Sequence, residues 1–130
     1  PLVPLQNTNA VLNMDMIGRQ DGLQEKDTSY VNLYLSDTIG SNLDQIAHNA
    51  SASAGAGMEI IYGYKGTDDF NIGGSDHASF EKKGIPVVYL YCGTHKDYHR
   101  PSDTWDKIDY SNMARITRTA FEIVWQLANK

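Results

Sequence analysis

The sequence predicts a three-layer α/β fold, an αβα sandwich around a mixed, mostly parallel sheet. Two kinds of segment lead to this prediction: short apolar runs rich in β-branched and aromatic residues, and longer stretches with apolar residues at helical spacing. They follow one another in the order β-β-α-β-α-β-α along a chain of 130 residues. A chain of this length can bury a genuine core, so we expect residues 1–130 to form one domain unit.

The first half of the chain holds three expected strands and one helix. Residues 11–17 form a nearly continuous apolar run, which is typical of a strand covered on both faces, and Gly18 ends it. Residues 30–35 are β-branched and aromatic and predict a second strand. Ser41 is a good helix cap and precedes apolar residues at helical spacing. Residues 58–62 fit a short third strand.

The second half predicts two helices and one strand. Residues 63–74 are rich in glycine and are expected to form a loop. Ser75 is expected to cap a short helix that ends at Gly84, which suits a left-handed position after a helix. Residues 86–91 form the strongest strand pattern, and Ser111 is expected to cap the last, amphipathic helix.

A long segment, residues 93–109, separates that strand from the last helix. Loops of this length in compact domains usually carry function. Ligands of open α/β sheets gather beyond the carboxyl ends of the strands. Asp15 ends the first expected strand and His99 lies in the long loop, so both are expected at that edge.

Composition excludes several classes of protein. The net charge is −5 and no basic stripe occurs, which argues against a nucleic-acid partner. No apolar run reaches the length of a membrane span. Cys92 is the single cysteine, so an internal disulfide is excluded and a buried thiol is expected. Nucleophile elbows, phosphate loops and His-Glu-x-x-His motifs are missing from the sequence.

Asp15 and His99 are the candidate metal ligands. An ionised carboxylate between Met14 and Met16 requires a cation or hydrogen-bond donors. A strand-end aspartate bonded to backbone amides remains an equal alternative. His99 precedes Pro101, which stiffens the loop as a ligand loop requires; a solvated loop histidine is the alternative.

Four further residues are candidates around these two. Tyr98 can donate a hydrogen bond to a developing oxyanion, or it is an ordinary packing aromatic. Asp103 can accept a hydrogen bond from a ring nitrogen behind a metal, or it is a turn residue. Asp76 and His77 open the short helix, where acidic residues are favoured on helical grounds alone.

Three segments, in this order and spacing, resemble the zinc aminopeptidases with a two-metal site, a family that also contains the glutaminyl cyclases. They are Asn13-Met14-Asp15-Met16-Ile17-Gly18, Ser75-Asp76-His77-Ala78-Ser79-Phe80 with Gly84-Ile85-Pro86, and Asp97-Tyr98-His99-Arg100-Pro101-Ser102-Asp103-Thr104. The resemblance spans nearly the whole chain, but only the C-terminal half of that family's catalytic domain. A chain that begins Pro1-Leu2-Val3-Pro4, without methionine, also indicates a piece of a longer protein. We therefore expect a partial domain.

The resemblance implies a role for each candidate residue. Asp15 corresponds to a ligand of the first zinc ion, His99 to a ligand of the second, and Tyr98 to the phenol that stabilises the tetrahedral intermediate. Asp76 and His77 correspond to a segment that buttresses the site. The family's first histidine, bridging aspartate and Glu-Glu pair have no counterpart in this chain. We therefore expect weak zinc binding and no activity from the chain alone.

The complete enzyme is expected to hold two zinc ions and to hydrolyse peptides that have a free N-terminus. A non-catalytic module that keeps the peptidase fold is one alternative, and a glutaminyl cyclotransferase is another. Residues 63–74 and 93–96 are the candidates for the specificity pocket. An exported or periplasmic parent is expected by resemblance, and self-association is expected because half a domain exposes a sheet edge.

Overall fold

The computed structural model describes residues 4–21, 29–37, 41–55, 57–65 and 75–129. The strands in these residues are β1 (Val11–Met14), β2 (Tyr30–Leu35), β3 (Glu59–Tyr64) and β4 (Val87–Tyr91). The α-helices are α1 (Asn42–Ala54), α2 (His77–Glu81) and α3 (Tyr110–Ala128), and the short 3-10 helices are η1 (Leu5–Asn7) and η2 (Trp105–Lys107). The predicted order of strands and α-helices is confirmed.

The four strands form one mixed sheet in the order β1-β4-β2-β3. β1 is parallel to β4 and β2 is parallel to β3, whereas β4 and β2 are antiparallel at the centre. β1 and β4 therefore end at one edge of the sheet, and β2 and β3 end at the opposite edge. Within the first pair, Asn13 lies beside Tyr89.

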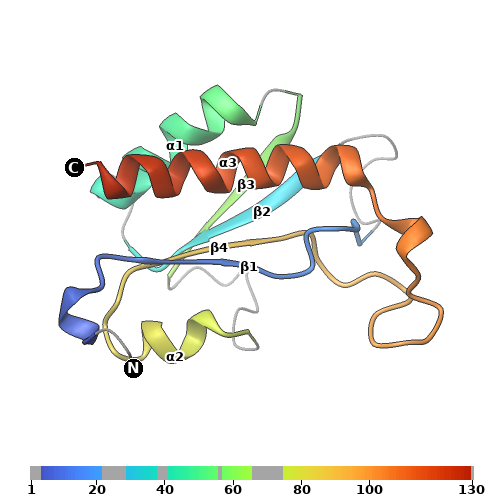
Figure 1. Cartoon of the computed structure of the whole chain (residues 1–130), viewed down its shortest axis with the longest axis horizontal. Helices are drawn as coiled ribbons and strands as arrows, with labels where there is room; N and C mark the ends of the chain where they lie inside the picture. Colours follow the sequence, from blue (N-terminus) through green and yellow to red (C-terminus); the bar gives the residue numbers. More distant parts are fainter. Residues whose placement is uncertain (1–3, 22–28, 38–40, 56, 66–74, 130) are drawn as a thin grey trace.

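Helices cover both faces of this sheet, which gives three layers (Figure 1). α1 and α3 pack side by side on one face, and the short α2 lies on the other. Fully buried residues of the larger core, between the sheet and the helix pair, include Val31, Leu33, Leu90, Ile116 and Ile123. The smaller cluster, on the α2 face, contains Tyr34, Val87 and Tyr89 with Phe80 packed against it. Each such side chain contributes about 1.5–3 kcal/mol by leaving water, and the predicted three-layer α/β fold is confirmed.

β1 is shorter than its apolar run predicts. Regular strand geometry ends at Met14 rather than Ile17. The Asp15 N–H still donates to the Leu90 carbonyl at 3.2 Å, but Met16 has a left-handed backbone with φ 57°. This conformation is uncommon for a residue with a side chain. It turns the chain out of the sheet directly after Asp15.

β3 ends later than predicted, since it includes Gly63 and Tyr64. The two residues continue the parallel ladder with Tyr34 and Leu35. The start of the segment expected as a loop is therefore strand, and residues 66–74 lie outside the described residues.

The helix caps follow the prediction in α1 but differ in α3. The Asp44 N–H donates to Ser41 Oγ at 3.1 Å, as expected. In α3 the cap is Asp109, which accepts from the Asn112 N–H at 2.9 Å, so the predicted Ser111 cap is wrong. Asp and Ser are equally good caps, and the sequence alone favoured the wrong one by two positions.

Cys92 is a fully buried free thiol, as predicted. Burial raises its pKa to about 12, so the thiol stays protonated at neutral pH. Among the described helices, none combines the length and the apolar character that crossing a bilayer requires.

Candidate active site

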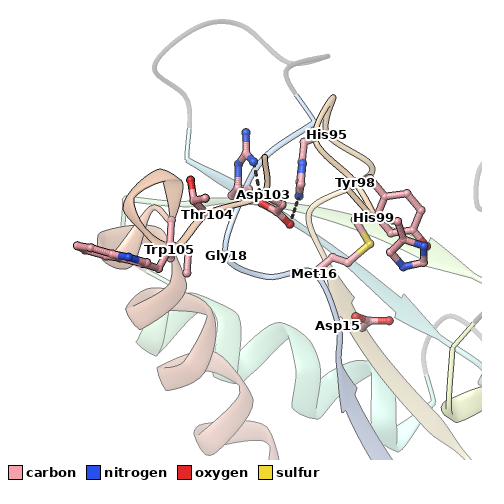
Figure 2. A pocket seen from close by; sticks show the side chains of 11 residues that line it. Asp15, Met16, Gly18, His95, Tyr98, His99, Asp103, Thr104 and Trp105 are labelled. Carbon is pink, nitrogen blue, oxygen red and sulfur yellow. Dashed lines mark hydrogen bonds and ion pairs between the residues drawn. The ribbon is translucent and has the colours of Figure 1, made fainter. Parts of the chain in front are cut away.

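A pocket of about 550 Å³ opens at the sheet edge where β1 and β4 end (Figure 2). Two segments form it: the turn that follows β1, and the long loop that follows β4. Its lining residues are Asp15, Met16, Gly18, Arg19, His95, Tyr98, His99, Asp103, Thr104, Trp105 and Ile108. This is the edge at which the sequence predicts a site.

Asp15 and His99 line this same pocket, although they come from distant parts of the chain. Both residues are exposed. Figure 2 shows their side chains on one side of the pocket, with Trp105 on the other side. The fold therefore brings the two candidate ligands to one cavity, where their donor atoms are open to solvent.

Asp15 is held by a side chain that lies 60 residues away in the sequence. The Ser75 hydroxyl donates to Asp15 Oδ2 at 2.9 Å and accepts from Asn13 Nδ2 at 2.8 Å. Ser75 is consequently not the cap of α2, contrary to the prediction. The position before α2 is Asp76, which makes no side-chain capping bond.

His99 sits in a strained turn beside Tyr98. Its φ is 55°, and the Tyr98 and His99 rings stack with centroids 3.9 Å apart. Met16 and His99 are the two non-glycine residues with positive φ within the described ranges, and both line the pocket. Such conformations cost on the order of 1–3 kcal/mol and concentrate at functional sites.

Arg19 clamps the long loop onto the turn after β1. Its two terminal nitrogens bind Asp103 Oδ1 at 2.8 Å and Asp97 Oδ2 at 2.9 Å. Asp97 also accepts from Ser102 Oγ at 2.7 Å and from Lys107 Nζ at 3.0 Å. The hydrogen bonds from Ser102 and Lys107 hold the pKa of Asp97 well below its usual range. The hydrogen bond to Asp103 raises the pKa of Arg19, so the guanidinium is charged at every physiological pH.

Asp103 contacts Arg19 and His95 rather than a candidate ligand. Its Oδ2 lies 3.7 Å from His95 Nε2, too far for a hydrogen bond but close enough for an ion pair if the imidazole is protonated. Figure 2 shows this pair at a wall of the pocket. Among the described residues, no hydrogen bond or ion pair joins Asp103 to His99.

His77 and Asp76 lie behind the pocket and do not line it. His77 is completely buried and stacks on Tyr89, with ring centroids 4.2 Å apart. Its Nδ1 lies 3.2 Å from Asn13 Nδ2. Burial, aided by the charge of Asp15, raises the pKa of Tyr89 to about 12. Asp76 is exposed at the start of α2.

Three residues of this region were not given a role by sequence reasoning. Arg19 joins the two halves of the pocket, Asn13 supports Ser75, and Trp105 stands at the rim with 75% of its surface exposed. Arg19 directly follows the segment Asn13–Gly18, and its charge is complementary to that of the acidic residues in the long loop. This complementarity would have identified Arg19. Nothing in the sequence pairs Asn13 with Ser75, because that contact depends on the packing of α2.

The described residues do not make up a complete zinc site. No three His, Cys, Asp or Glu side chains in the described ranges converge closely enough to hold a metal ion. The pocket offers Asp15 and His99, while Asp103 is engaged by Arg19. A catalytic zinc takes about three protein ligands, and the described part of the chain brings fewer than that together.

Solved structures with the same fold include three aminopeptidases. LapA aminopeptidase of Legionella pneumophila superposes with a TM-score of 0.69 at 21% identity, covering 94% of this chain and 32% of that chain. The aminopeptidase from Aneurinibacillus sp. strain AM-1 gives 0.63 at 27% identity, with 94% and 26% covered. BSAP, a zinc aminopeptidase from Bacillus subtilis, gives 0.64 at 19% identity, with 95% and 29% covered.

The chain therefore spans about a third or less of each of these three chains. A search of curated protein sequences gives no match. The family model for peptidase family M28 matches residues 2–124. Because this match takes in nearly the entire chain and the fold agrees with it, the chain belongs to peptidase family M28.

Proposed function

We propose that this chain forms one part of the active site of a zinc-dependent aminopeptidase. Asp15 and His99 each provide one ligand to a two-zinc centre, and the remaining ligands come from sequence upstream of this chain. The observation that carries this proposal is that the two side chains line one pocket at the end of β1 and β4. Membership of family M28 and three aminopeptidases among the similar structures support it.

The other pocket residues bind and orient the substrate in this proposal. The exposed Tyr98 phenol, stacked beside His99, donates a hydrogen bond to the oxyanion of the tetrahedral intermediate. Such donors contribute a few kcal/mol when they are preorganised. Arg19 and Asp103 keep the loop in place, and Asp76 and His77 support the site from behind. The substrate is a peptide with a free N-terminus.

The test uses the chain joined to its natural upstream sequence. We expect the joined enzyme to release the N-terminal residue from aminoacyl p-nitroanilides. His99→Ala is expected to lower kcat by more than about 100-fold, a larger effect than that of mutating a residue that only supports a metal ligand. His48→Ala is the matched control, because His48 is an exposed histidine on α1. Full activity of His99→Ala would exclude its role as a ligand.

The same assay separates the alternative functions. Formation of pyroglutamate from an N-terminal glutamine, without release of amino acids, would identify a glutaminyl cyclotransferase. Absence of both reactions in a zinc-loaded joined protein would favour a non-catalytic module. On its own the chain is expected to hydrolyse nothing, since it offers two candidate ligands.

Two further proposals concern the surroundings of the protein. The parent enzyme is exported, by analogy with its family. The chain alone associates with itself, because β1 is an edge strand of the described sheet and α3 exposes Phe121, Val124 and Trp125. Unpaired edges and contiguous apolar surface both favour pairing with another chain.

A further inference from the structure

A chain of hydrogen bonds leads from the pocket to a buried imidazole. It starts at Asp15 Oδ2, passes through the Ser75 hydroxyl and the Asn13 amide, and reaches Nδ1 of His77. Each contact is between 2.8 and 3.2 Å. Asp15 is the exposed end of this series of hydrogen bonds, and His77 is its fully buried end.

The chemistry of these groups gives the hydrogen-bond chain one direction. The Asn13 Nδ2 group has two hydrogens and no acceptor, so it donates to both Ser75 and His77. Nδ1 of His77 is then the acceptor of the hydrogen bond from Asn13. Ser75 has one hydrogen, and because its oxygen already accepts from Asn13, that hydrogen is free for Asp15.

The sheet fixes the positions of Asn13 and His77, the buried half of this series of hydrogen bonds. Asn13 lies in β1 and Asp15 directly follows the strand, and their hydrogen bonds to the same Ser75 hydroxyl place both side chains on the same side of the sheet. Tyr89 is the neighbour of Asn13 on β4, and the His77 ring stacks on Tyr89. The imidazole therefore lies above Asn13, held by packing rather than by the pocket itself.

We propose that Asn13 and His77 are positioning residues that set the orientation of the Asp15 carboxylate through Ser75. The proposal rests on the function proposed above, in which Asp15 is a zinc ligand. Ser75 donates to Oδ2, which would leave Oδ1 available to the zinc ion. Asn13 keeps the Ser75 hydroxyl pointing at Asp15, and His77 keeps the Asn13 amide from rotating.

The test measures zinc affinity and kcat of the joined enzyme, using competition with a chromogenic zinc chelator. Asn13→Leu keeps the side-chain volume but donates nothing, and is expected to weaken zinc binding by about 10–100-fold, the usual effect of removing support behind a ligand. His77→Phe keeps the stacking on Tyr89 but loses the acceptor, and is expected to act in the same direction. Asn49→Leu, an exposed position on α1, is the matched control.

A double-mutant cycle distinguishes positioning from a general loss of structure. In a Ser75→Ala background the link to Asp15 is already broken, so Asn13→Leu is expected to weaken zinc binding no further. Additive losses of zinc affinity, or a wild-type affinity in both Asn13→Leu and His77→Phe, would overturn the proposal. Urea unfolding of the metal-free proteins separately reports stability, and His77→Phe serves if Asn13→Leu does not fold.

The outcome is separable from that of the proposed function. If the wild-type joined protein binds no zinc, the proposed function fails and this inference falls with it. If wild-type enzyme binds zinc and His99→Ala abolishes hydrolysis, the function stands. The positioning role alone is then decided by the Asn13 and His77 variants.

Discussion

At the scale of single residues, Gly93 shows how closely the start of the long loop after β4, residues 93–109, is packed. Its φ is +81°, and a Cβ at this position would lie 2.1 Å from Asp21 Oδ2. Asp21 is fixed there, because its carboxylate accepts from the Tyr30 hydroxyl and its N–H donates to the Cys92 carbonyl at 3.1 Å. A glycine is therefore required where the chain leaves β4 towards the pocket.

Gly93→Ala is expected to lower the free energy of unfolding by about 2–4 kcal/mol, from overpacking and from backbone strain. Urea unfolding followed by tryptophan fluorescence measures this change. Gly57→Ala is a matched control: Gly57 has the same φ of +81°, but nothing lies within 4 Å of its added Cβ. Equal losses in the two variants would mean that the contact with Asp21 is unimportant.

Asp97 predicts an acid-dependent part of stability. Hydrogen bonds from Ser102 and Lys107 depress the pKa of this carboxyl. A depressed pKa contributes stability above the unfolded-state value of about 4, and this contribution is lost as the pH falls towards the folded value. Asp97→Asn should therefore lower the urea midpoint most above about pH 5. Its difference from wild type should shrink below about pH 4, whereas an exposed Asp76→Asn control should change little throughout.

At the scale of elements, the beginning of α3 links helix stability to the site. Asp109 caps the helix through the Asn112 N–H, and its own N–H donates to the Gly18 carbonyl at 2.9 Å. The cap therefore fastens the end of the long loop to the turn after β1. Both of these segments line the pocket.

Asp109→Ala is expected to lower the free energy of unfolding by about 1 kcal/mol, the usual value of an N-terminal cap. Ser111→Ala should change it much less, since Ser111 lies inside the helix and is exposed. Thermal unfolding of the two variants by circular dichroism compares them directly. A larger loss of stability in Ser111→Ala than in Asp109→Ala would identify Ser111 as the capping residue, as the sequence suggests.

Elements that depend on local patterns were predictable, and those that depend on tertiary contacts were not. The α1 cap and the strand patterns of β2 and β4 follow from local composition. The end of β1 does not, because it depends on the positive φ of Met16, which runs against the backbone preference of methionine. Ser75 looked like a cap because its better partner, Asp15, is distant in sequence.

The candidate site was partly predictable for the same reason. Asp15 and His99 follow strands that proved to be parallel neighbours, so their shared pocket follows from topology alone. The supporting contacts of Asn13 and Arg19 depend on α2 and on the path of the loop. No pattern in the sequence encodes the contact of Asn13, and the pairing of Arg19 is indicated only by opposite charges that lie far apart in the chain.

At the scale of the whole molecule, one surface of α3 is unusually apolar. Phe121 and Trp125 stack with ring centroids 6.1 Å apart and are 64% and 56% exposed. Helix α1 packs against α3, and these aromatic rings remain on its exposed surface. Together with edge strand β1 they are the surface from which we propose self-association.

Trp125→Lys is therefore expected to shift the isolated chain towards monomer, because a charge on this surface opposes apolar pairing. Sedimentation velocity over a range of concentrations measures the shift. Gln126→Lys adds the same charge at the neighbouring, half-buried position and is the control. A monomeric wild-type chain at every concentration would contradict the proposed association.

Helix α3 runs back along the sheet from the end of β4, and it brings the end of the described chain close to the start of β1. Asn9 and Ala10 line a small cavity together with Leu127 and Ala128, so the incoming and outgoing segments are neighbours. Figure 1 shows η1 and the last turns of α3 on the left, whereas the loop after β4 lies on the right. An affinity tag at either terminus would thus anchor the protein to a sensor chip by its far side. The mouth containing Asp15 and His99 would face the flowing solution, which suits direct measurement of metal and peptide binding.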